Sequence, residues 1–151
     1  VIVPSHTAGE TARGKERPGF GGQRDVPVYK TTPTPDGTSA LITAEISDLA
    51  ERLPGIVGAT GVYAVFARGE SMSPKYDHGD IVYIHPDRPI MAGGYVLVGY
   101  KDSRVIIRRL ISRGDSVVVL RRLNPLRDER HTPDSFEFIH HILSLNELVG
   151  L

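Results

Sequence analysis

The chain has 151 residues, of which 40% are hydrophobic and 24% are charged, a composition typical of a single soluble domain that buries a core. Basic and acidic residues number 18 each, so the chain lacks the positive excess of a free-standing nucleic-acid-binding protein. The chain has no cysteines, which excludes disulfides and thiolate metal sites. It also has no apolar run of the roughly 18 residues that span a membrane, which argues against a membrane partner.

Residues 1–25 combine several prolines and glycines with scattered charges and few apolar side chains. Such a segment cannot offset its ordering entropy by burial, so it predicts a flexible linker ahead of a folded domain over residues 26–151. The chain starts at Val1 without an initiator methionine, which indicates that a further part precedes it. The amino terminus lacks the pattern of a secretion signal, and we expect a cytoplasmic protein.

The first part of the domain contains strand signals separated by turn residues. Residues 26–29 predict a first strand and residues 39–46 a second, because short apolar and alternating patterns occur there. Residues 30–37 between them are rich in threonine and proline and predict a loop. Residues 47–53 carry helix-compatible side chains before Pro54 and predict one or two helical turns.

Further strands are predicted where β-branched and aromatic residues cluster between turns. They cover residues 62–67, 81–84, 95–100, 104–111, 116–120 and 136–143. Many short strands joined by tight turns predict a mainly β domain with strongly curved, mostly antiparallel sheets and one or two short helical turns.

A serine stands at the corner between two of these strands. Ser71 follows the strand 62–67 and enters a short turn with Pro74, which can present the serine hydroxyl on the surface. The N–H groups of Ser71 and Met72 would then be free to bind a developing oxyanion, which is the geometry of a nucleophile. The alternative is structural, with Ser71 capping a turn and Pro74 starting a helical turn.

This serine segment resembles a family of self-cleaving repressors. The residues that carry the resemblance are Gly69-Glu70-Ser71-Met72-Ser73-Pro74, Gly79-Asp80-Ile81-Val82 and Tyr95-Val96-Leu97-Val98, joined by Val26-Pro27-Val28-Tyr29, Arg108-Arg109-Leu110 and Leu123-Asn124-Pro125. They are similar to the carboxy-terminal domain of LexA and of phage CI-type repressors, and fit the prophage branch best. The resemblance implies the β fold of the LexA and signal-peptidase type, a Ser-Lys dyad, and a helix-turn-helix DNA-binding domain ahead of the linker.

The position of the catalytic base departs from that family. In relatives a lysine precedes an Arg-Leu pair on a strand, and burial lowers its pKa so that a free amine can take the serine proton. The matching pattern here puts Arg108 at that position. Arginine stays protonated and has no acceptor, so it can hydrogen-bond to Ser71 but cannot activate it. Lys101 could be proposed as a substitute, but it falls in a predicted hairpin turn, where a solvated lysine keeps its charge.

The bond that relatives cut is a second departure. It is usually an Ala-Gly bond shortly after the first strand, and the aligned bond here is Thr32-Pro33. A proline on the leaving side makes this bond a poor substrate. Asp36-Gly37 is an alternative, although this pair is also a common turn sequence. Both departures predict weak or no self-cleavage.

The leading hypothesis is the oligomerisation domain of a prophage-type transcriptional repressor that retains Ser71 in a degenerate peptidase cleft. The alternative is an active self-cleaving peptidase that uses another base and cuts within residues 30–40. A third hypothesis is that the unused cleft binds a protein ligand such as an antirepressor.

Partners follow from the same resemblance. Relatives dimerise through this domain. The apolar segment 136–143, followed by Leu145, Leu148, Val149 and Leu151, is expected to bury against a second subunit. Operator DNA is expected to bind only through the preceding domain, and a RecA filament is a further candidate partner. No cofactor is expected. No metal site is expected either, because the adjacent His140 and His141 point to opposite faces of a strand.

Overall fold

The computed structural model describes residues 23–151, and within this range the chain forms one nine-stranded sheet with three short helical segments. The helical segments are η1 (Pro54–Ile56), η2 (Pro133–Ser135) and α1 (Leu145–Val149). The strands are β1 (Arg24–Pro33), β2 (Ala40–Glu51), β3 (Tyr63–Phe66), β4 (Ile81–His85), β5 (Tyr95–Tyr100), β6 (Arg104–Arg113), β7 (Val118–Leu123), β8 (Leu126–His131) and β9 (Phe136–Ile142). The predicted mainly β fold is confirmed. Most of the expected linker, residues 1–22, lies outside the described range.

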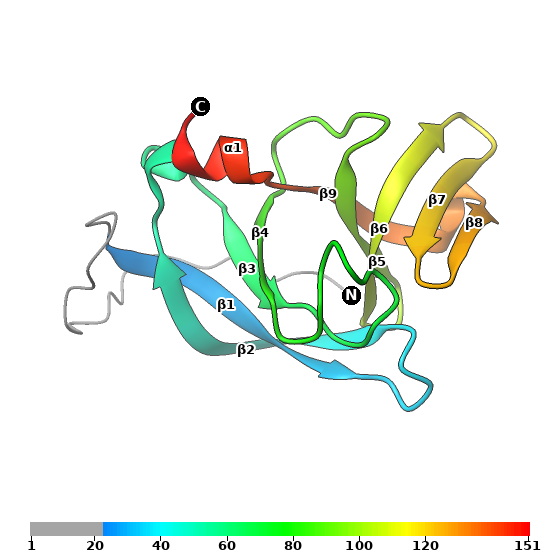
Figure 1. Cartoon of the computed structure of the whole chain (residues 1–151), viewed down its shortest axis with the longest axis horizontal. Helices are drawn as coiled ribbons and strands as arrows, with labels where there is room; N and C mark the ends of the chain where they lie inside the picture. Colours follow the sequence, from blue (N-terminus) through cyan, green and yellow to red (C-terminus); the bar gives the residue numbers. More distant parts are fainter. Residues whose placement is uncertain (1–22) are drawn as a thin grey trace.

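The sheet closes on itself through β2. In space the strands follow the order β2-β1-β3-β4-β9-β5-β6-β7-β8, and β2 pairs with β6 as well as with β1. The closing pairs are Ala40 with Val105 and Leu41 with Arg104. Figure 1 shows the long, twisted β1–β2 hairpin along one side of the molecule, with β7 and β8 beyond β6. Closure therefore brings the turn of the β1–β2 hairpin next to β6.

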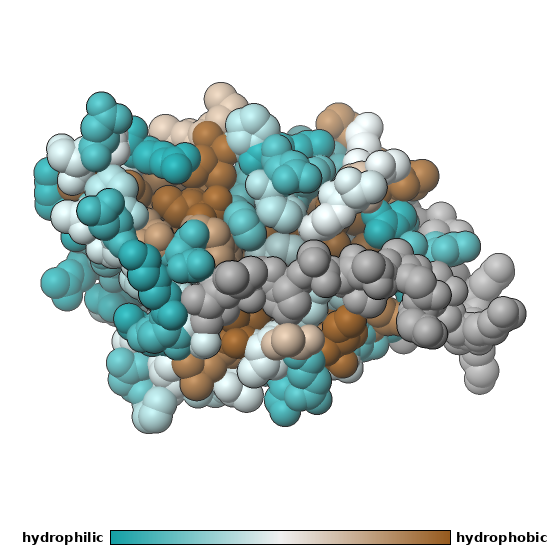
Figure 2. All heavy atoms as spheres, turned by 180° about the vertical axis from the view of Figure 1, so that it is seen from behind, coloured by the Kyte–Doolittle hydropathy of each residue, from teal (hydrophilic) through white to brown (hydrophobic). Residues whose placement is uncertain are grey.

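The closed part of the sheet surrounds the main hydrophobic core. This core takes buried side chains from most of the strands, and burial of this apolar surface is the main favourable contribution to folding. Its members include Tyr29, Ile42, Val65, Ile84, Leu97, Val105 and Ile142. Figure 2 shows the opposite side of the molecule, where hydrophilic side chains predominate and apolar residues show between them. The described helices are too short and too polar to cross a membrane.

Two of the predicted local structures are wrong. The sequence predicts helical turns over residues 47–53, but β2 runs through to Glu51 and pairs with β1 along this stretch. Ser47 donates to the Val28 carbonyl, and Ala50 packs into a buried cluster, so strand pairing and burial override the local helix propensity. The predicted loop 30–37 is also shorter than expected, because β1 continues to Pro33.

The predicted carboxy-terminal strand is present in the structure. The strand expected over residues 136–143 is β9, which lies between β4 and β5 in the middle of the sheet. Ile142 is buried in the main core and Phe138 packs against it, and burial of this strand against a second subunit stays a prediction. The helix α1, which the sequence pattern did not indicate, follows it and packs Leu148 against a second buried cluster.

Helix α1 docks tightly on η1. An added Cβ at Gly55 would overlap the backbone carbonyl of Glu147, so only glycine fits this contact. At the other end, Ser144 and Glu147 form a capping box in which each side chain accepts from the backbone N–H of the other. The Glu147 carboxylate also pairs with Arg88 and lies 2.9 Å from His141 Nε2.

We predict that Gly55→Ala destabilises the protein by about 2 kcal/mol or more, because the methyl group forces α1 away from η1. Gly58→Ala is the matched control, since a Cβ there meets nothing within 4 Å and the change should stay within about 0.5 kcal/mol. Urea unfolding of the three proteins measures the effect. Equal stability of the two variants would contradict the docking described for α1.

The acid stability of the protein should depend on Glu147. Burial raises the pKa of its carboxyl, but hydrogen bonds from the Ser144 N–H, His141 and Arg88 outweigh this and bring the pKa from 4.5 to about 2. A lowered pKa in the folded state stabilises the fold above pH 4.5, and that contribution is lost as the pH falls toward about 2. As the pH is lowered from 4.5 to about 2, the free energy of unfolding should fall less steeply in Glu147→Gln than in the parent protein. The control Glu137→Gln should behave like the parent.

Candidate functional site

The serine lies in a loop that is closed by backbone hydrogen bonds. The Ala67 N–H donates to the Asp80 carbonyl at 2.8 Å, and the Gly79 N–H donates to the Ala67 carbonyl at 2.7 Å. These bonds join the end of β3 to the start of β4, so the residues between them form a compact loop at the ends of these two strands. Ser71 stands at its first turn, as the sequence predicts from the two flanking strands.

A second hairpin holds the backbone of the serine. The N–H groups of Leu123 and Asn124, in the β7–β8 turn, donate to the Ser71 carbonyl at 3.1 and 2.9 Å. The Asn124 side chain donates to the Glu70 carbonyl at 3.1 Å. The N–H groups of Ser71 and Met72 take no part in these contacts, and their role toward an oxyanion stays a prediction.

Arg108 lies beside the serine hydroxyl. Its Nη1 donates to Ser71 Oγ at 3.4 Å and to the Ile107 carbonyl at 2.8 Å. The Arg108 side chain is only 3% exposed. The pairing of β6 with β5 and β7 fixes this strand, so the alternation of side chains directs Arg108 toward the serine loop. The structure thus brings together the two residues that the sequence singles out.

The charge of Arg108 is balanced by a residue that the sequence analysis missed. Arg108 Nε donates to Glu129 Oε1 at 2.9 Å, and the Glu129 side chain is 21% exposed. Glu129 lies on β8, a strand that the turn-rich segment after Pro125 did not reveal. A buried guanidinium requires such a partner, because an isolated charge in the interior costs several kcal/mol.

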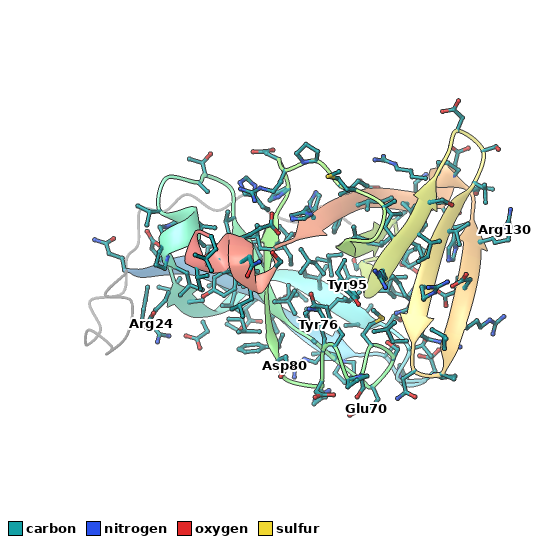
Figure 3. All side chains as sticks on the ribbon, turned by 45° about the horizontal axis from the view of Figure 1, so that its top comes forward. Arg24, Glu70, Tyr76, Asp80, Tyr95 and Arg130 are labelled. Carbon is teal, nitrogen blue, oxygen red and sulfur yellow. The ribbon has the colours of Figure 1, made fainter. Side chains whose placement is uncertain are left out.

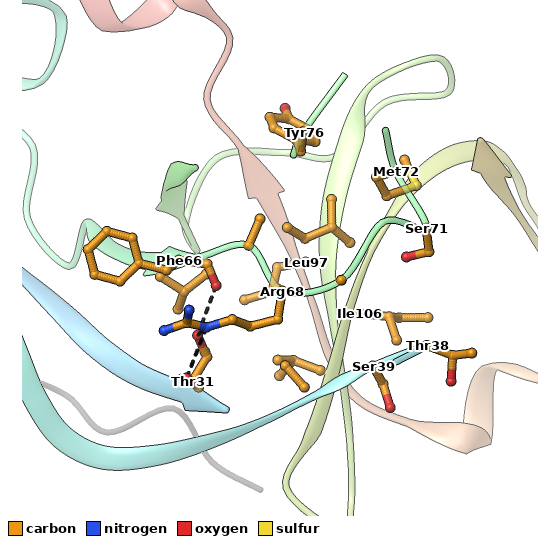
Figure 4. Close-up of a pocket in the computed structure, with 16 residues that line it drawn as sticks. Thr31, Thr38, Ser39, Phe66, Arg68, Ser71, Met72, Tyr76, Leu97 and Ile106 are labelled. Atoms are coloured by element: carbon orange, nitrogen blue, oxygen red, sulfur yellow. Dashed lines mark hydrogen bonds between the residues drawn. The ribbon is translucent and has the colours of Figure 1, made fainter. Parts of the chain in front are cut away.

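A small cleft adjoins Ser71, and its walls come from three parts of the chain. Figure 4 shows the Ser71 hydroxyl directed toward the space between the serine loop, the β1–β2 hairpin and β6. The lining includes Ser71, Met72, Arg68, Thr38, Ser39 and Ile106. The space measures about 30 Å³, enough for roughly two water molecules and too small for a peptide. The chain's own hairpin therefore fills most of the cleft.

The expected cleavage segment lies close to the serine loop without presenting the expected bonds to it. Thr32 and Pro33 belong to β1 and pair with β2, so the Thr32-Pro33 bond is held in a strand. Asp36 accepts hydrogen bonds from Thr34 and Thr38, which makes the Asp36-Gly37 pair part of a tight turn. None of Thr32, Pro33, Asp36 and Gly37 lines the cleft.

The turn is nevertheless packed directly on the serine loop. Gly69 has φ of +79°, and a Cβ there would collide with the Gly37 carbonyl. Glycine is required at this position both by the left-handed backbone and by the close approach. The residues that follow the turn, Thr38 and Ser39, are those that line the cleft opposite Ser71.

The lysines among residues 23–151 lie outside the cleft. Lys30 pairs with Glu45, and Lys101 is exposed in the β5–β6 turn. Lys75 lies over the rings of Tyr76 and Tyr95, which meet edge to face with centroids 5.5 Å apart and are labelled in Figure 3. None of these three lysines lines the cleft.

The adjacent histidines have separate environments. His140 Nδ1 lies 2.7 Å from the Tyr63 hydroxyl, and burial lowers the pKa of His140 to about 4, so its ring is neutral near pH 7. His141 contacts Glu147 on the other face of β9. Within residues 23–151 no group of three or more metal-binding side chains is present.

Comparison with known proteins agrees with the family resemblance of the segment around Ser71. Residues 34–142 match the family described as Peptidase S24-like, and this range includes Ser71, Arg108 and Glu129. The chain belongs to the Peptidase S24-like family. It is also 22% identical over 148 residues to Repressor protein C of Rhizobium phage 16-3, with 93% of this chain covered. The match spans 55% of that relative, so the chain corresponds to about half its length.

The Arg108–Glu129 pair should contribute measurably to stability. We predict that Arg108→Met lowers the free energy of unfolding by about 2 kcal/mol, because it leaves a largely buried carboxylate without its partner. Arg109→Met, one residue along the same strand, is the control, since Arg109 lies against Tyr95 near the surface and donates to the Gly93 carbonyl. A loss at Arg108→Met no larger than that of the control would contradict a structural ion pair.

Proposed function

We propose that this chain supplies the oligomerisation domain of a phage-type transcriptional repressor, and that its peptidase cleft no longer supports self-cleavage. The Peptidase S24-like match and the similarity to a phage repressor protein support the repressor part. Operator DNA would be bound by a separate domain, because the balanced charge of this chain does not favour independent DNA binding. Self-association would then align two such DNA-binding domains on a palindromic site.

The observation that carries the second part is the contact between Arg108 and Ser71. A serine nucleophile needs a neighbouring group that accepts its proton, and the neighbour here is a guanidinium that donates to the hydroxyl. Arginine does not lose its proton at any pH at which the protein is folded. Loss of a general base typically lowers such a rate by orders of magnitude.

The packing of the β1–β2 turn supports the same conclusion. Cleavage requires a carbonyl carbon positioned about 3 to 3.5 Å from the serine oxygen. The Thr32-Pro33 bond is held in β1, and the Asp36-Gly37 bond lies in a turn whose hydrogen bonds would have to break first. Both candidate bonds are therefore held in geometries that oppose attack.

We predict that the chain stays intact when it is incubated with activated RecA filament or at alkaline pH. Intact mass spectrometry should give one species, and Ser71→Ala should behave like the parent. Fragments that result from a cut within residues 30–40, and that disappear in Ser71→Ala, would instead establish the active peptidase with an unexpected base. Fragments that persist in Ser71→Ala would indicate a contaminating protease, and the purification is then repeated until they disappear.

A further inference from the structure

Glu129 is the residue whose role the proposed function leaves open. The Glu129 carboxylate and the Ser71 hydroxyl contact different nitrogens of the Arg108 guanidinium. Nε donates to Glu129 Oε1 at 2.9 Å, and Nη1 donates to Ser71 Oγ at 3.4 Å. Arg108 is thus bound at both ends of its guanidinium, with the Ile107 carbonyl as a third partner. This arrangement fixes both the direction and the charge of the side chain at position 108.

We propose that Glu129 is a second determinant of the inactive cleft, a positioning residue that keeps any cation at position 108 protonated and directed at Ser71. This inference rests on the proposed function. It follows that a lysine at position 108 would not by itself restore a base. Two opposing effects would set the pKa of that lysine: burial, which lowers it, and the carboxylate, which raises it.

The magnitudes decide the outcome. Full burial lowers the pKa of a lysine by as much as about 3 to 5 units, and an opposite charge within about 4 Å restores about 1 to 3 of them. If burial removes about 4 units and Glu129 restores about 2, a lysine at position 108 would have a pKa of about 8.4 and remain mostly charged at about pH 7.5. With Glu129 replaced by glutamine, the pKa would fall to about 6.4, so the fraction of free amine would rise from roughly one tenth to roughly nine tenths.

The other ionisable groups around position 108 do not supply the same effect. On β8, His131 Nε2 lies 3.9 Å from Glu129 Oε1, and an imidazole carries no negative charge that could replace that of the carboxylate. On β5, burial is the main cause of the raised pKa of Tyr100, so its hydroxyl is neutral at the test pH. Arg104, at the start of β6, lies over the Tyr100 ring and pairs with Asp102. Glu129 is thus the carboxylate that contacts Arg108.

With a free amine at position 108, the residues around the cleft could cleave a peptide bond of the chain itself. The Ser71 oxygen would bond to a carbonyl carbon in the 34–40 segment while its proton passes to the amine of the lysine introduced at position 108. This amine would return the proton to the leaving nitrogen as the C–N bond breaks, and water would then hydrolyse the ester. In the parent chain the first proton transfer has no acceptor, because residue 108 is arginine.

The experiment compares Arg108→Lys with the double variant Arg108→Lys/Glu129→Gln. Cleavage of each chain is followed by intact mass spectrometry between about pH 7 and pH 10. We expect the double variant to cleave about eightfold faster at about pH 7.5, with its rate rising at a pH at least about one unit lower. Ser71→Ala in the double variant should abolish cleavage. Arg108→Lys/Asp128→Asn is the matched control, because Asp128 pairs with Arg121 on the other face of β8.

A second measurement keeps the inference testable if neither variant cleaves. The pKa of the amine introduced by Arg108→Lys can be followed by NMR through its attached carbon, with and without Glu129→Gln. A pKa that is at least about one unit lower in the double variant than in Arg108→Lys supports the role of Glu129. Equal pKa values, or equal rates when both variants cleave measurably, would overturn it while leaving the proposed function intact. Cleavage of the parent chain would instead overturn the proposed function.

Discussion

The Arg108 guanidinium is almost completely buried and makes three contacts at once, with Glu129, with the Ile107 carbonyl and with the hydroxyl of Ser71. Burying a permanent charge is costly unless the surrounding groups satisfy it. The groups around the cleft therefore have to satisfy the hydrogen bonds and the charge of this guanidinium. The same contacts that satisfy the charge leave the serine with a donor beside it where a nucleophile requires an acceptor.

The fold supplies these contacts from distant parts of the chain. Closure of the sheet through β2 and β6 brings the β1–β2 turn over the serine loop, where Gly37 and Gly69 touch. The β7–β8 hairpin contacts the site through its turn and through its second strand. Its turn binds the carbonyl of Ser71, and its second strand carries Glu129. A change in either hairpin would alter the serine environment without touching the serine itself.

Much of this arrangement could be predicted from local sequence pattern. The strands on either side of Ser71 are short, β-branched and bounded by turn residues. Arg108 is identified through the resemblance to repressors in which a lysine precedes an Arg-Leu pair. Glu129 was missed because β8 is rich in charge and lacks an apolar alternation. Residues 47–53 have helical propensity, whereas the pairing with β1 that overrides it is a contact between distant residues. The location of β9 between β4 and β5 likewise depends on topology, which local pattern does not encode.

A charged arginine, fixed by Glu129, lies beside Ser71, and NMR of the Arg108 side chain in the intact chain tests this arrangement most directly. We expect a slowly exchanging Nε–H signal with contacts to Glu129, unchanged from about pH 6 to about pH 10 and lost in Glu129→Gln. A rapidly exchanging signal without contacts to Glu129 or Ser71 would contradict it.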